Sequence, residues 1–376
     1  MICFAWAGFP QYAARCIRTL VNTTGEDVVI VATKPRVPIE GMDALCGCEV
    51  IWIEYSETRP IIEILNGRMP RALFVTGWKV RVFKDFRDQA RGCGCKVVSM
   101  VDNNQLMGIA PLLSFHGLRL AIRESMKALR FKCFIKGKFD AYFVPGKSGE
   151  RLLSNYGVPQ KQIVKGLYSS DSTLFGSDVP LSAREKKIIY VGQYIERKNV
   201  VRMVDAFAKA VAIANCKGWV LELYGSGSQK EELMSKAAEL NVGLKAYDAR
   251  IVVRDFTQPA QLARLYQGAR ALCLPSLEEH WGLVVHEAAL NGCMLLLSRY
   301  VGASEDLVLF DGCDGINGKL FDPYNAIDIK DAFVKFLLMT DTELDSAKKA
   351  SLAMAAKISK DGFAKSVIQI VERCKE

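Results

Sequence analysis

Residues 271–298 read ALCLPSLEEHWGLVVHEAALNGCMLLLS, and the order of apolar and polar segments in this stretch points to one architecture. Two apolar runs of strand length, Ala271–Leu274 and Met294–Ser298, enclose a helical pattern at Leu283–Leu290. Both runs are continuously hydrophobic, which is typical of strands buried on both faces of a parallel sheet. The stretch therefore predicts a strand–helix–strand unit of an α/β protein.

The same alternation extends back to the N-terminus. In the second, downstream half of the chain, strands are also predicted at Lys187–Val191, Trp219–Tyr224 and Arg250–Val253. In the first, upstream half they are predicted at Ile2–Trp6, Val28–Ala32, Val50–Ile53, Ala72–Val75, Lys96–Val101, Ala141–Val144 and Ile163–Lys165. A chain of 376 residues exceeds one ordinary core. We predict two Rossmann-like domains facing each other across a cleft. Their expected bounds are 1–167 and 186–360, with a Ser- and Gly-rich linker at 168–185 and a C-terminal helix at 361–376 that returns toward the first domain.

The composition excludes several classes of protein. Half of the residues are hydrophobic and about a quarter are charged, as in a globular chain. No apolar run reaches the ~18–20 residues of a membrane-spanning helix, and we interpret Met1–Ala7 as a buried strand, so a cytoplasmic protein is expected. The twelve Cys are scattered, and the close pairs Cys46/Cys48 and Cys93/Cys95 lack zinc-site spacing and nearby His. Reduced thiols and no metal site are predicted.

Positive charge is concentrated upstream. Residues 1–180 carry 24 Lys and Arg against 16 Asp and Glu, and the segment 79–138 alone carries thirteen against four. Such a patch favours an anionic partner. No nucleic-acid-binding module accompanies it, so nucleic acid is not expected. The stretch Arg119–Lys138 alternates basic and apolar residues, which fits either a helix lying on an anionic membrane or a solvated helix covering the sheet.

The chemistry is expected beyond the carboxyl ends of the downstream strands, where open parallel sheets bind ligands. The loops there are rich in glycine and charge, which allows close backbone approach to an anion and exposes helix N-termini. They are Gly192-Gln193, Gly225-Ser226-Gly227, Arg254-Asp255-Phe256, Pro275 to Glu279, and Arg299 to Gly302. A ligand bearing phosphate is the expected occupant.

Within the opening stretch, Glu279-His280-Trp281-Gly282-Leu283 is followed by a second glutamate, Glu287, eight residues after the first. This spacing resembles the Glu-x7-Glu motif of retaining GT-B glycosyltransferases, the group called glycosyltransferase family 4 (group 1). The resemblance implies that Glu287 binds the ribose and Glu279 contacts the donor sugar. Gly282 is expected to open a helix whose free N–H groups, with Leu283, help to bind the diphosphate. His280 and Trp281 are included in the donor site.

Further segments carry the same resemblance and extend the expected donor site. Gly192 to Lys198 is similar to the family's diphosphate-binding loop, which assigns Lys198 to neutralising charge on the leaving group. The family usually has Arg where this chain has Gln193, and Arg197 is a candidate substitute. Gly225 and Gly227, and the segment Gly302 to Glu305, resemble loops beside the nucleotide and donor. Residues 164–175, including Asp171, resemble the family's interdomain segment.

The upstream domain is expected to hold the acceptor, a glycan or a lipid-linked molecule. Gly8 follows the first strand, and Asp102 follows a later strand where related enzymes have His-Asp. Asp102 is a candidate catalytic or acceptor-contacting residue, and a turn-forming Asp before Asn is the alternative.

The resemblance implies transfer with retention, without a metal or other cofactor, because the nucleotide sugar is a substrate. Surface polysaccharide or glycoconjugate assembly by a cytoplasmic or peripheral membrane enzyme is the expected setting. Gln193, Ala303 and Val101, which stands where related enzymes have His before Asp102, leave open a catalytically weak nucleotide-sugar-binding subunit of the same fold. An NAD-dependent enzyme is disfavoured because Gly225-Ser226-Gly227-Ser228-Gln229-Lys230 lacks the third glycine of the dinucleotide fingerprint.

Overall fold

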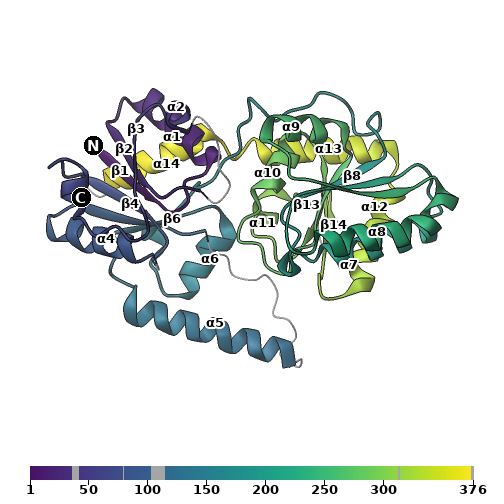
Figure 1. Cartoon of the computed structure of the whole chain (residues 1–376), viewed down its shortest axis with the longest axis horizontal. Helices are drawn as coiled ribbons and strands as arrows, with labels where there is room; N and C mark the ends of the chain where they lie inside the picture. The colour runs from purple at the N-terminus through teal and green to yellow at the C-terminus, as the bar shows by residue number, and fades with distance from the viewer. Residues whose placement is uncertain (36–41, 79, 103–114, 312–313, 374–376) are drawn as a thin grey trace. The chain divides into compact units, whose positions relative to one another are not determined.

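A computed structural model of the chain describes residues 1–35, 42–78, 80–102, 115–311 and 314–373. The described residues form two compact units (Figure 1). The upstream unit comprises the described residues up to Asp171 together with those from Ile358 onward, and the downstream unit comprises those between Ser172 and Lys357.

The upstream unit is built on a seven-stranded parallel sheet in the order β3-β2-β1-β4-β5-β6-β7. Its strands are β1 Ile2–Trp6, β2 Val28–Ala32, β3 Glu49–Trp52, β4 Ala72–Thr76, β5 Lys96–Met100, β6 Ala141–Val144 and β7 Ile163–Lys165. Its helices are α1 Gln11–Thr24, α2 Met42–Cys46, α3 Ile61–Ile64, α4 Arg81–Gly92, α5 Phe115–Phe134, α6 Lys147–Asn155, the 3-10 turn Gln160–Gln162, and α14 Lys360–Arg373.

Alternation along β1 divides the upstream core into two layers. Phe4 and its alternate neighbours on β1 point toward α1 and α14, whereas Cys3 and Ala5 point toward α4 and α6. Successive side chains of a strand face opposite sides, so a fully buried strand needs apolar residues at every position. All five residues of β1 are buried, which explains its unbroken hydrophobic sequence.

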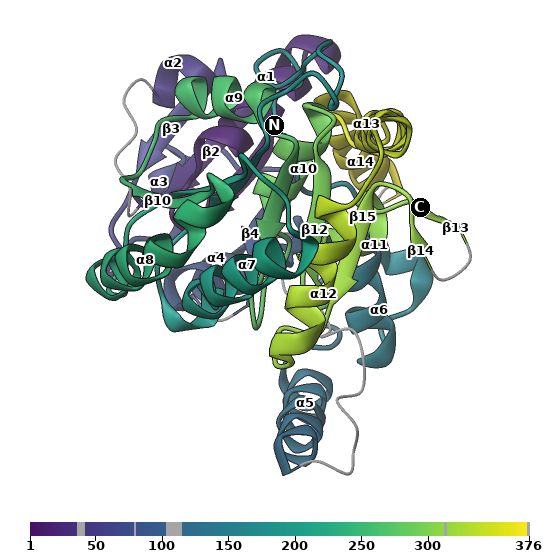
Figure 2. The same ribbon diagram turned by 90° about the vertical axis from the view of Figure 1, so that its right-hand side faces the viewer.

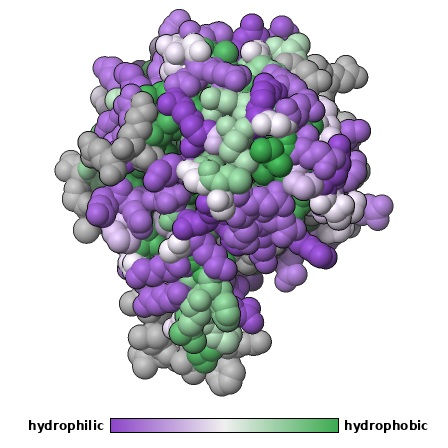
Figure 3. Space-filling model, turned by 90° about the vertical axis from the view of Figure 1, so that its left-hand side faces the viewer, coloured by the Kyte–Doolittle hydropathy of each residue, from purple (hydrophilic) through white to green (hydrophobic). Residues whose placement is uncertain are grey.

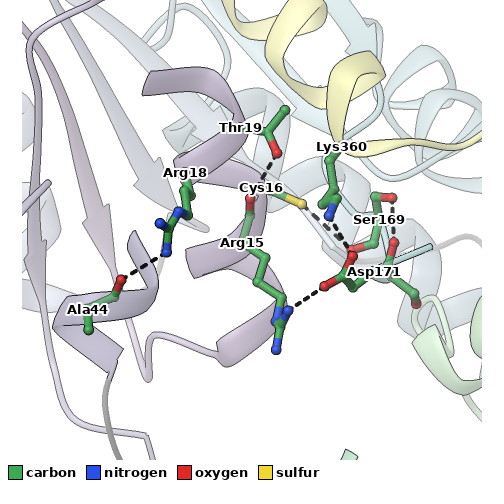
Figure 4. Close-up of polar contacts among 9 residues, drawn as sticks. Arg15, Cys16, Arg18, Thr19, Ala44, Ser169, Asp171 and Lys360 are labelled. Atoms are coloured by element: carbon green, nitrogen blue, oxygen red, sulfur yellow. Dashed lines mark hydrogen bonds and ion pairs between the residues drawn. The ribbon is translucent and has the colours of Figure 1, made fainter. Parts of the chain in front are cut away.

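A buried carboxylate joins three parts of this unit. Asp171, whose side chain is 4% exposed, forms ion pairs with Arg15 of α1 and Lys360 of α14 (Figure 4). The neighbouring Ser169 carbonyl accepts a contact from the Cys16 thiol at 3.6 Å. Asp171 is the last upstream-unit residue before the chain enters the other unit, and Lys360 lies two residues after Ile358, where the chain returns. The Asp171 carboxylate therefore links α1 to both segments in which the chain passes from one unit to the other.

The downstream unit contains a six-stranded parallel sheet in the order β10-β9-β8-β11-β12-β15 and a hairpin of β13 and β14. Its strands are β8 Lys187–Val191, β9 Val220–Tyr224, β10 Arg250–Arg254, β11 Ala271–Leu274, β12 Met294–Ser298, β13 Phe310–Asp311, β14 Asp314–Gly315 and β15 Gly318–Phe321. Its helices are α7 Val200–Ala214, α8 Lys230–Leu244, α9 Pro259–Gly268, α10 Leu283–Leu290, α11 Ser304–Leu307, α12 Ala326–Leu337 and α13 Asp341–Ala355, with 3-10 turns at Glu196–Lys198 and Lys245–Tyr247.

Helices cover both faces of the downstream sheet. α7, α8 and α12 lie on one face and α9, α10 and α13 on the other (Figure 2). The predicted α/β class with two parallel sheets is confirmed, and every predicted strand is present to within about a residue or two at each end. β15 and the β13–β14 hairpin were not predicted as strands. The basic and apolar stretch Arg119–Lys138 lies largely in α5, which begins at Phe115, and residues 103–114 lie outside the described part of the chain.

None of the described helices is long and apolar enough to cross a bilayer. No group of three His, Cys, Asp or Glu side chains within the described ranges is arranged to hold a metal ion.

Candidate active site

Two loops of the downstream unit bring Lys198 and Glu279 together. Lys198 ends the 3-10 turn after β8, and Glu279 lies in the loop after β11. Their strands are neighbours in the parallel sheet, so both loops leave the same edge. The Lys198 Nζ forms an ion pair with Glu279 Oε2, and the two side chains are only 11% and 13% exposed. The Ser276 hydroxyl donates to the same oxygen at 3.2 Å.

The backbone of Glu279 is fixed by the segment that follows β12. The Glu279 N–H donates to the Tyr300 carbonyl at 3.2 Å, and the Glu279 carbonyl accepts from the Gly302 N–H at 3.1 Å. Glu279 and Val301 thereby form a one-residue parallel bridge that prolongs the sheet pairing beyond the strands. Because both backbone groups of Glu279 are hydrogen-bonded, its side chain extends from a fixed point. A preorganised polar site requires such fixed groups.

The backbone around Lys198 is tied to the same region. Leu277 N–H donates to the Arg197 carbonyl at 2.8 Å. Asn199, with a left-handed φ of 58°, donates through its side chain to the carbonyls of Pro275 and Pro323 at 3.3 and 2.9 Å. These contacts fix the direction in which Lys198 leaves the backbone.

Helix α10 begins beside this pair. Its N-cap is Gly282, with φ of 85°, and no side chain caps its first N–H groups. The backbone angle favours glycine here, and a Cβ at Gly282 would also be tightly packed, 3.2 Å from Glu279 Cγ and 3.3 Å from Leu274 Cδ2. Uncapped amides at a helix start attract anions.

Glu287 is directed toward α9. The Tyr266 hydroxyl donates to Glu287 Oε2 at 3.2 Å, and burial raises the pKa of the Glu287 carboxyl to about 7. Desolvation disfavours the charged form, and the hydrogen bond from Tyr266 offsets only part of this effect. Perturbed carboxyls of this kind gather at functional sites. As a whole residue, Glu287 is half-buried.

The glycines of the predicted donor loops have a structural role. A Cβ on Gly225 would lie 1.8 Å from the Gly192 carbonyl oxygen, and one on Gly227 would lie 2.4 Å from the Tyr194 carbonyl oxygen. The Tyr194 N–H also donates to the Ser226 carbonyl at 2.8 Å. The loops after β8 and β9 therefore touch backbone to backbone, which explains these glycines without any ligand.

The remaining candidates of the downstream unit surround this centre. Gln193 is exposed and its carbonyl accepts from the Tyr190 hydroxyl. Arg197 is also exposed and donates to the Glu278 carbonyl.

The other candidates lie around the start of α10. His280 is half-exposed, with its Nε2 3.9 Å from Glu278 Oε1, whereas Trp281 is buried. Leu283 starts α10. Glu305 lies in α11 and follows the segment whose Ala303 N–H donates to the Trp281 carbonyl at 2.9 Å.

Two of the candidates belong to the upstream unit. Gly8, with φ of 62°, donates its N–H to the buried Thr33 hydroxyl at 2.8 Å. Asp102 is exposed and hydrogen-bonds Tyr168, whose ring packs edge-on against Tyr12 with centroids 5.2 Å apart. Burial together with the nearby Asp102 charge raises the pKa of the Tyr168 hydroxyl, so this phenol stays protonated.

Sequence reasoning missed two side chains of the site. Ser276 lies three residues before Glu279 in the quoted loop, and a hydroxyl at the end of a buried strand was the available signal. The sequence does not indicate a functional role for Tyr266, because an aromatic residue on an amphipathic helix is expected in the core. The Tyr266 ring does pack edge-on against Phe175.

Comparison with known proteins identifies this region. Residues 177–353 match the family model of the glycosyl transferases group 1. This part of the chain resembles a group 1 glycosyl transferase domain. It contains the entire downstream sheet and the Lys198–Glu279 pair, so the resemblance drawn from the two glutamates is confirmed at the level of the family.

Similar proteins support the same assignment. An uncharacterized glycosyltransferase of Methanocaldococcus jannaschii is 28% identical over 131 residues, which are 35% of this chain and 32% of that protein. The match thus spans about a third of that relative's length. A glycosyltransferase from Rickettsia africae has a TM-score of 0.71 at 12% identity, covering 100% of this chain and 99% of that one. Anabaena HepE in complex with UDP and glucose has a TM-score of 0.67 at 13% identity, covering 99% and 100%. At these identities the structures show the fold alone, which is GT-B.

Proposed function

We propose that the protein is a retaining, metal-independent glycosyltransferase that moves a sugar from a nucleoside diphosphate donor to a hydroxyl of a glycan or lipid-linked acceptor, in surface polysaccharide or glycoconjugate assembly. The Lys198–Glu279 ion pair beside the uncapped start of α10, inside a group 1 domain, is the observation that carries this proposal. The HepE complex with UDP and glucose has the same fold and supports a nucleotide-sugar donor.

Lys198 is assigned to the departing diphosphate. When the anomeric C–O bond breaks, negative charge grows on the leaving phosphate, and a fixed ammonium with uncapped helix amides stabilises that charge. Glu279 holds the ammonium in place before the donor binds and contacts the donor sugar afterwards. A nearly dry setting strengthens both interactions relative to water.

Glu287 is assigned to the ribose hydroxyls, which donate to its ionised carboxylate. Gln193 and Arg197 are assigned to the diphosphate, as a neutral and a charged donor at the loop after β8. Gly192, Gly225, Gly227, His280, Trp281, Leu283 and Glu305 complete the proposed donor-binding set. No cofactor enters this scheme. Gly8 and Asp102 are assigned to the acceptor side.

The alternative is a nucleotide-sugar-binding subunit with little catalysis. Gln193 in place of the expected Arg favours it, because one positive charge is absent near the diphosphate, and the exposed Arg197 is engaged with a backbone carbonyl. Closure of the protein around the donor must redirect that guanidinium before it can replace the missing charge.

A binding experiment followed by a transfer experiment distinguishes these proposals. Melting temperatures of the purified chain are measured with UDP-, GDP- and ADP-sugars, and a UDP-sugar is expected to stabilise it most. The best donor is then tested for hydrolysis and transfer with and without EDTA, with NMR reading the anomeric configuration of the product. Binding without turnover supports the subunit alternative, and no binding at millimolar concentration refutes both. An inverted product or loss of activity in EDTA refutes the proposed mechanism.

A further inference from the structure

One face of α5 is apolar although it does not face the core. Ala128, Phe131 and Ile135 point into the upstream core, where Phe131 packs on Trp78 and Tyr156 with ring centroids 5.2 and 5.1 Å away. Ile122, Met126 and Leu129 follow each other at spacings of four and three and therefore line the opposite side of the helix. They are 52%, 56% and 62% exposed, and Phe134 at the helix end is 66% exposed. We call these four side chains the α5 stripe.

This arrangement decides between the two interpretations left open by the sequence. A helix that merely covers a core has a polar outer face. Here the outer face is apolar, and Figure 3 shows hydrophobic side chains gathered over this projecting helix with hydrophilic ones beside them. A solvated covering helix does not account for a contiguous row of exposed large apolar residues, which marks an interaction surface.

Positive charge flanks the α5 stripe. Between Ile122 and Lys138 the chain has six Lys and Arg residues, namely Arg123, Lys127, Arg130, Lys132, Lys136 and Lys138, against Glu124 alone. Lys127 pairs with that glutamate at 2.7 Å. The segment therefore carries a net charge of +5 (six minus one), and the occupant of the apolar surface must be complementary to strong positive charge.

A hollow adjoins the end of the stripe. A cavity of about 280 Å³ is lined by aromatic and aliphatic side chains together with Lys84, Lys127, Arg130 and Glu124. Its charged lining has three cations against one anion, so an apolar cavity with a net positive charge suits an amphiphile that has an anionic head.

We propose that α5 docks the protein on an anionic lipid bilayer, with the α5 stripe at the level of the acyl chains and the flanking Lys and Arg side chains on the lipid phosphates. A basic helix with one apolar face lies in the membrane interface, bound by apolar burial and by attraction to anionic lipid. No described helix spans a bilayer, so this attachment is peripheral. It goes beyond the transfer reaction, and only its use in presenting a lipid-linked acceptor rests on the proposed function.

The apolar contribution is tested by sedimenting the full chain with vesicles of phosphatidylcholine alone and with about 30% phosphatidylglycerol, which is enough anionic lipid to attract basic segments. Met126→Ser/Leu129→Ser is compared with Met234→Ser/Leu338→Ser, because Met234 and Leu338 in the downstream unit are equally exposed at 52% and 59%. The parent and the control pair bind the anionic vesicles, and the α5 pair binds about tenfold or more weakly.

The electrostatic contribution has its own pair of variants. Lys132→Gln/Lys136→Gln weakens binding, whereas Lys217→Gln/Lys245→Gln, also at exposed positions, leaves it unchanged. Added salt releases the parent protein, because attraction to lipid phosphates is screened. Melting temperature and nucleotide-sugar binding are recorded for every variant, so a failure of membrane docking is separated from misfolding and from failure of the proposed donor site.

Equal binding of the α5 and control pairs overturns the proposal, as does absence of binding to anionic vesicles. Light scattering tests the rival occupant, a second copy of the chain. A dimer that Met126→Ser/Leu129→Ser converts to a monomer, without vesicle binding by the parent, assigns the stripe to self-association.

Discussion

The phenolic oxygen of Tyr266 lies 3.2 Å from Oε2 of Glu287, so the carboxyl proposed to bind ribose is held by an uncharged donor from the neighbouring helix α9. Tyr266 favours the ionised form of Glu287, but burial opposes it more strongly and brings the pKa to about 7. The donor site is therefore expected to respond to pH in the physiological range.

Donor affinity should rise as pH increases from 6 to 8. Ribose hydroxyls donate to a carboxylate, and protonation of Glu287 below pH 7 removes an acceptor, so the affinity falls by up to about tenfold per pH unit below the midpoint. A nucleotide sugar has a diphosphate diester that does not titrate in this range. Calorimetric titration of the best donor from the panel measures the profile. Glu287→Gln should bind weakly and flatten it, and a parent profile as flat as that of the variant contradicts the assignment.

The same group gives a stability prediction without any ligand. The folded-state pKa of Glu287 lies above its ordinary value of 4.5, so its contribution is most favourable below about pH 4.5 and is lost as pH rises through 7. Because one pKa unit corresponds to about 1.4 kcal/mol, ionising this buried carboxyl destabilises the folded state by on the order of 3 kcal/mol at pH 8. Glu287→Gln should accordingly raise the melting temperature at pH 8 more than at pH 5. Calorimetric scans at the two pH values check this, and an equal effect at both contradicts it.

Lys198→Ala should lower kcat by about 100-fold or more, because stabilisation of the leaving group acts in the transition state. The variant also leaves Glu279 nearly buried without its ammonium, so part of the loss is structural. A double-mutant cycle with Glu279→Gln separates the two effects. The double variant should recover the lost stability while kcat stays low. Full recovery of kcat would make Lys198 a structural partner only, and Glu287→Ala, which should chiefly raise the donor KM, serves as the contrasting variant.

The meeting of Lys198 with Glu279 could be predicted from sequence because it depends on topology. Both residues follow strands of one parallel sheet, and the strands are adjacent. The pairing of Glu287 with Tyr266 could not, since it depends on how α9 packs on α10. The sequence of α5 likewise shows that apolar and basic residues alternate along the helix. It does not show which apolar residues pack on the core and which remain exposed.

The donor-loop glycines show a further limit of sequence reasoning. Gly192, Gly225 and Gly227 are predicted to contact the donor, yet a Cβ at Gly225 or Gly227 would overlap the backbone of the loop after β8, which already requires glycine at these two positions. The sequence of one loop does not show how closely a second loop approaches it, so this backbone contact could not be predicted. β15 was missed as a strand for a simpler reason, because a four-residue strand with a glycine and a lysine lacks the continuous apolar run that identified its neighbours.

Asp171→Asn should lower the free energy of unfolding by about 2–4 kcal/mol, because two cations, Arg15 and Lys360, lose the carboxylate that both contact. The matched control is Glu49→Gln, which removes one charge from the exposed Arg68–Glu49 pair of the same unit, with side chains 44% and 48% exposed. That change should cost less than about 1 kcal/mol. Urea unfolding compares them, and equal costs would mean that the buried carboxylate contributes nothing beyond a surface pair.

Gly225→Ala should destabilise the downstream unit by about 2–4 kcal/mol, since its methyl group would overlap the Gly192 carbonyl and force two backbones apart. Gly243→Ala in α8 is the control, because nothing lies within 4 Å of a Cβ at that position and alanine favours a helix by about 0.5–1 kcal/mol. The two substitutions add the same atom and should change stability in opposite directions in chemical denaturation. Because the Gly192 loop leads directly to Lys198, Gly225→Ala should also weaken donor binding. Stability equal to that of the parent would show that the two loops are not in backbone contact, and the proposed positioning of Lys198 by that contact would fail with it.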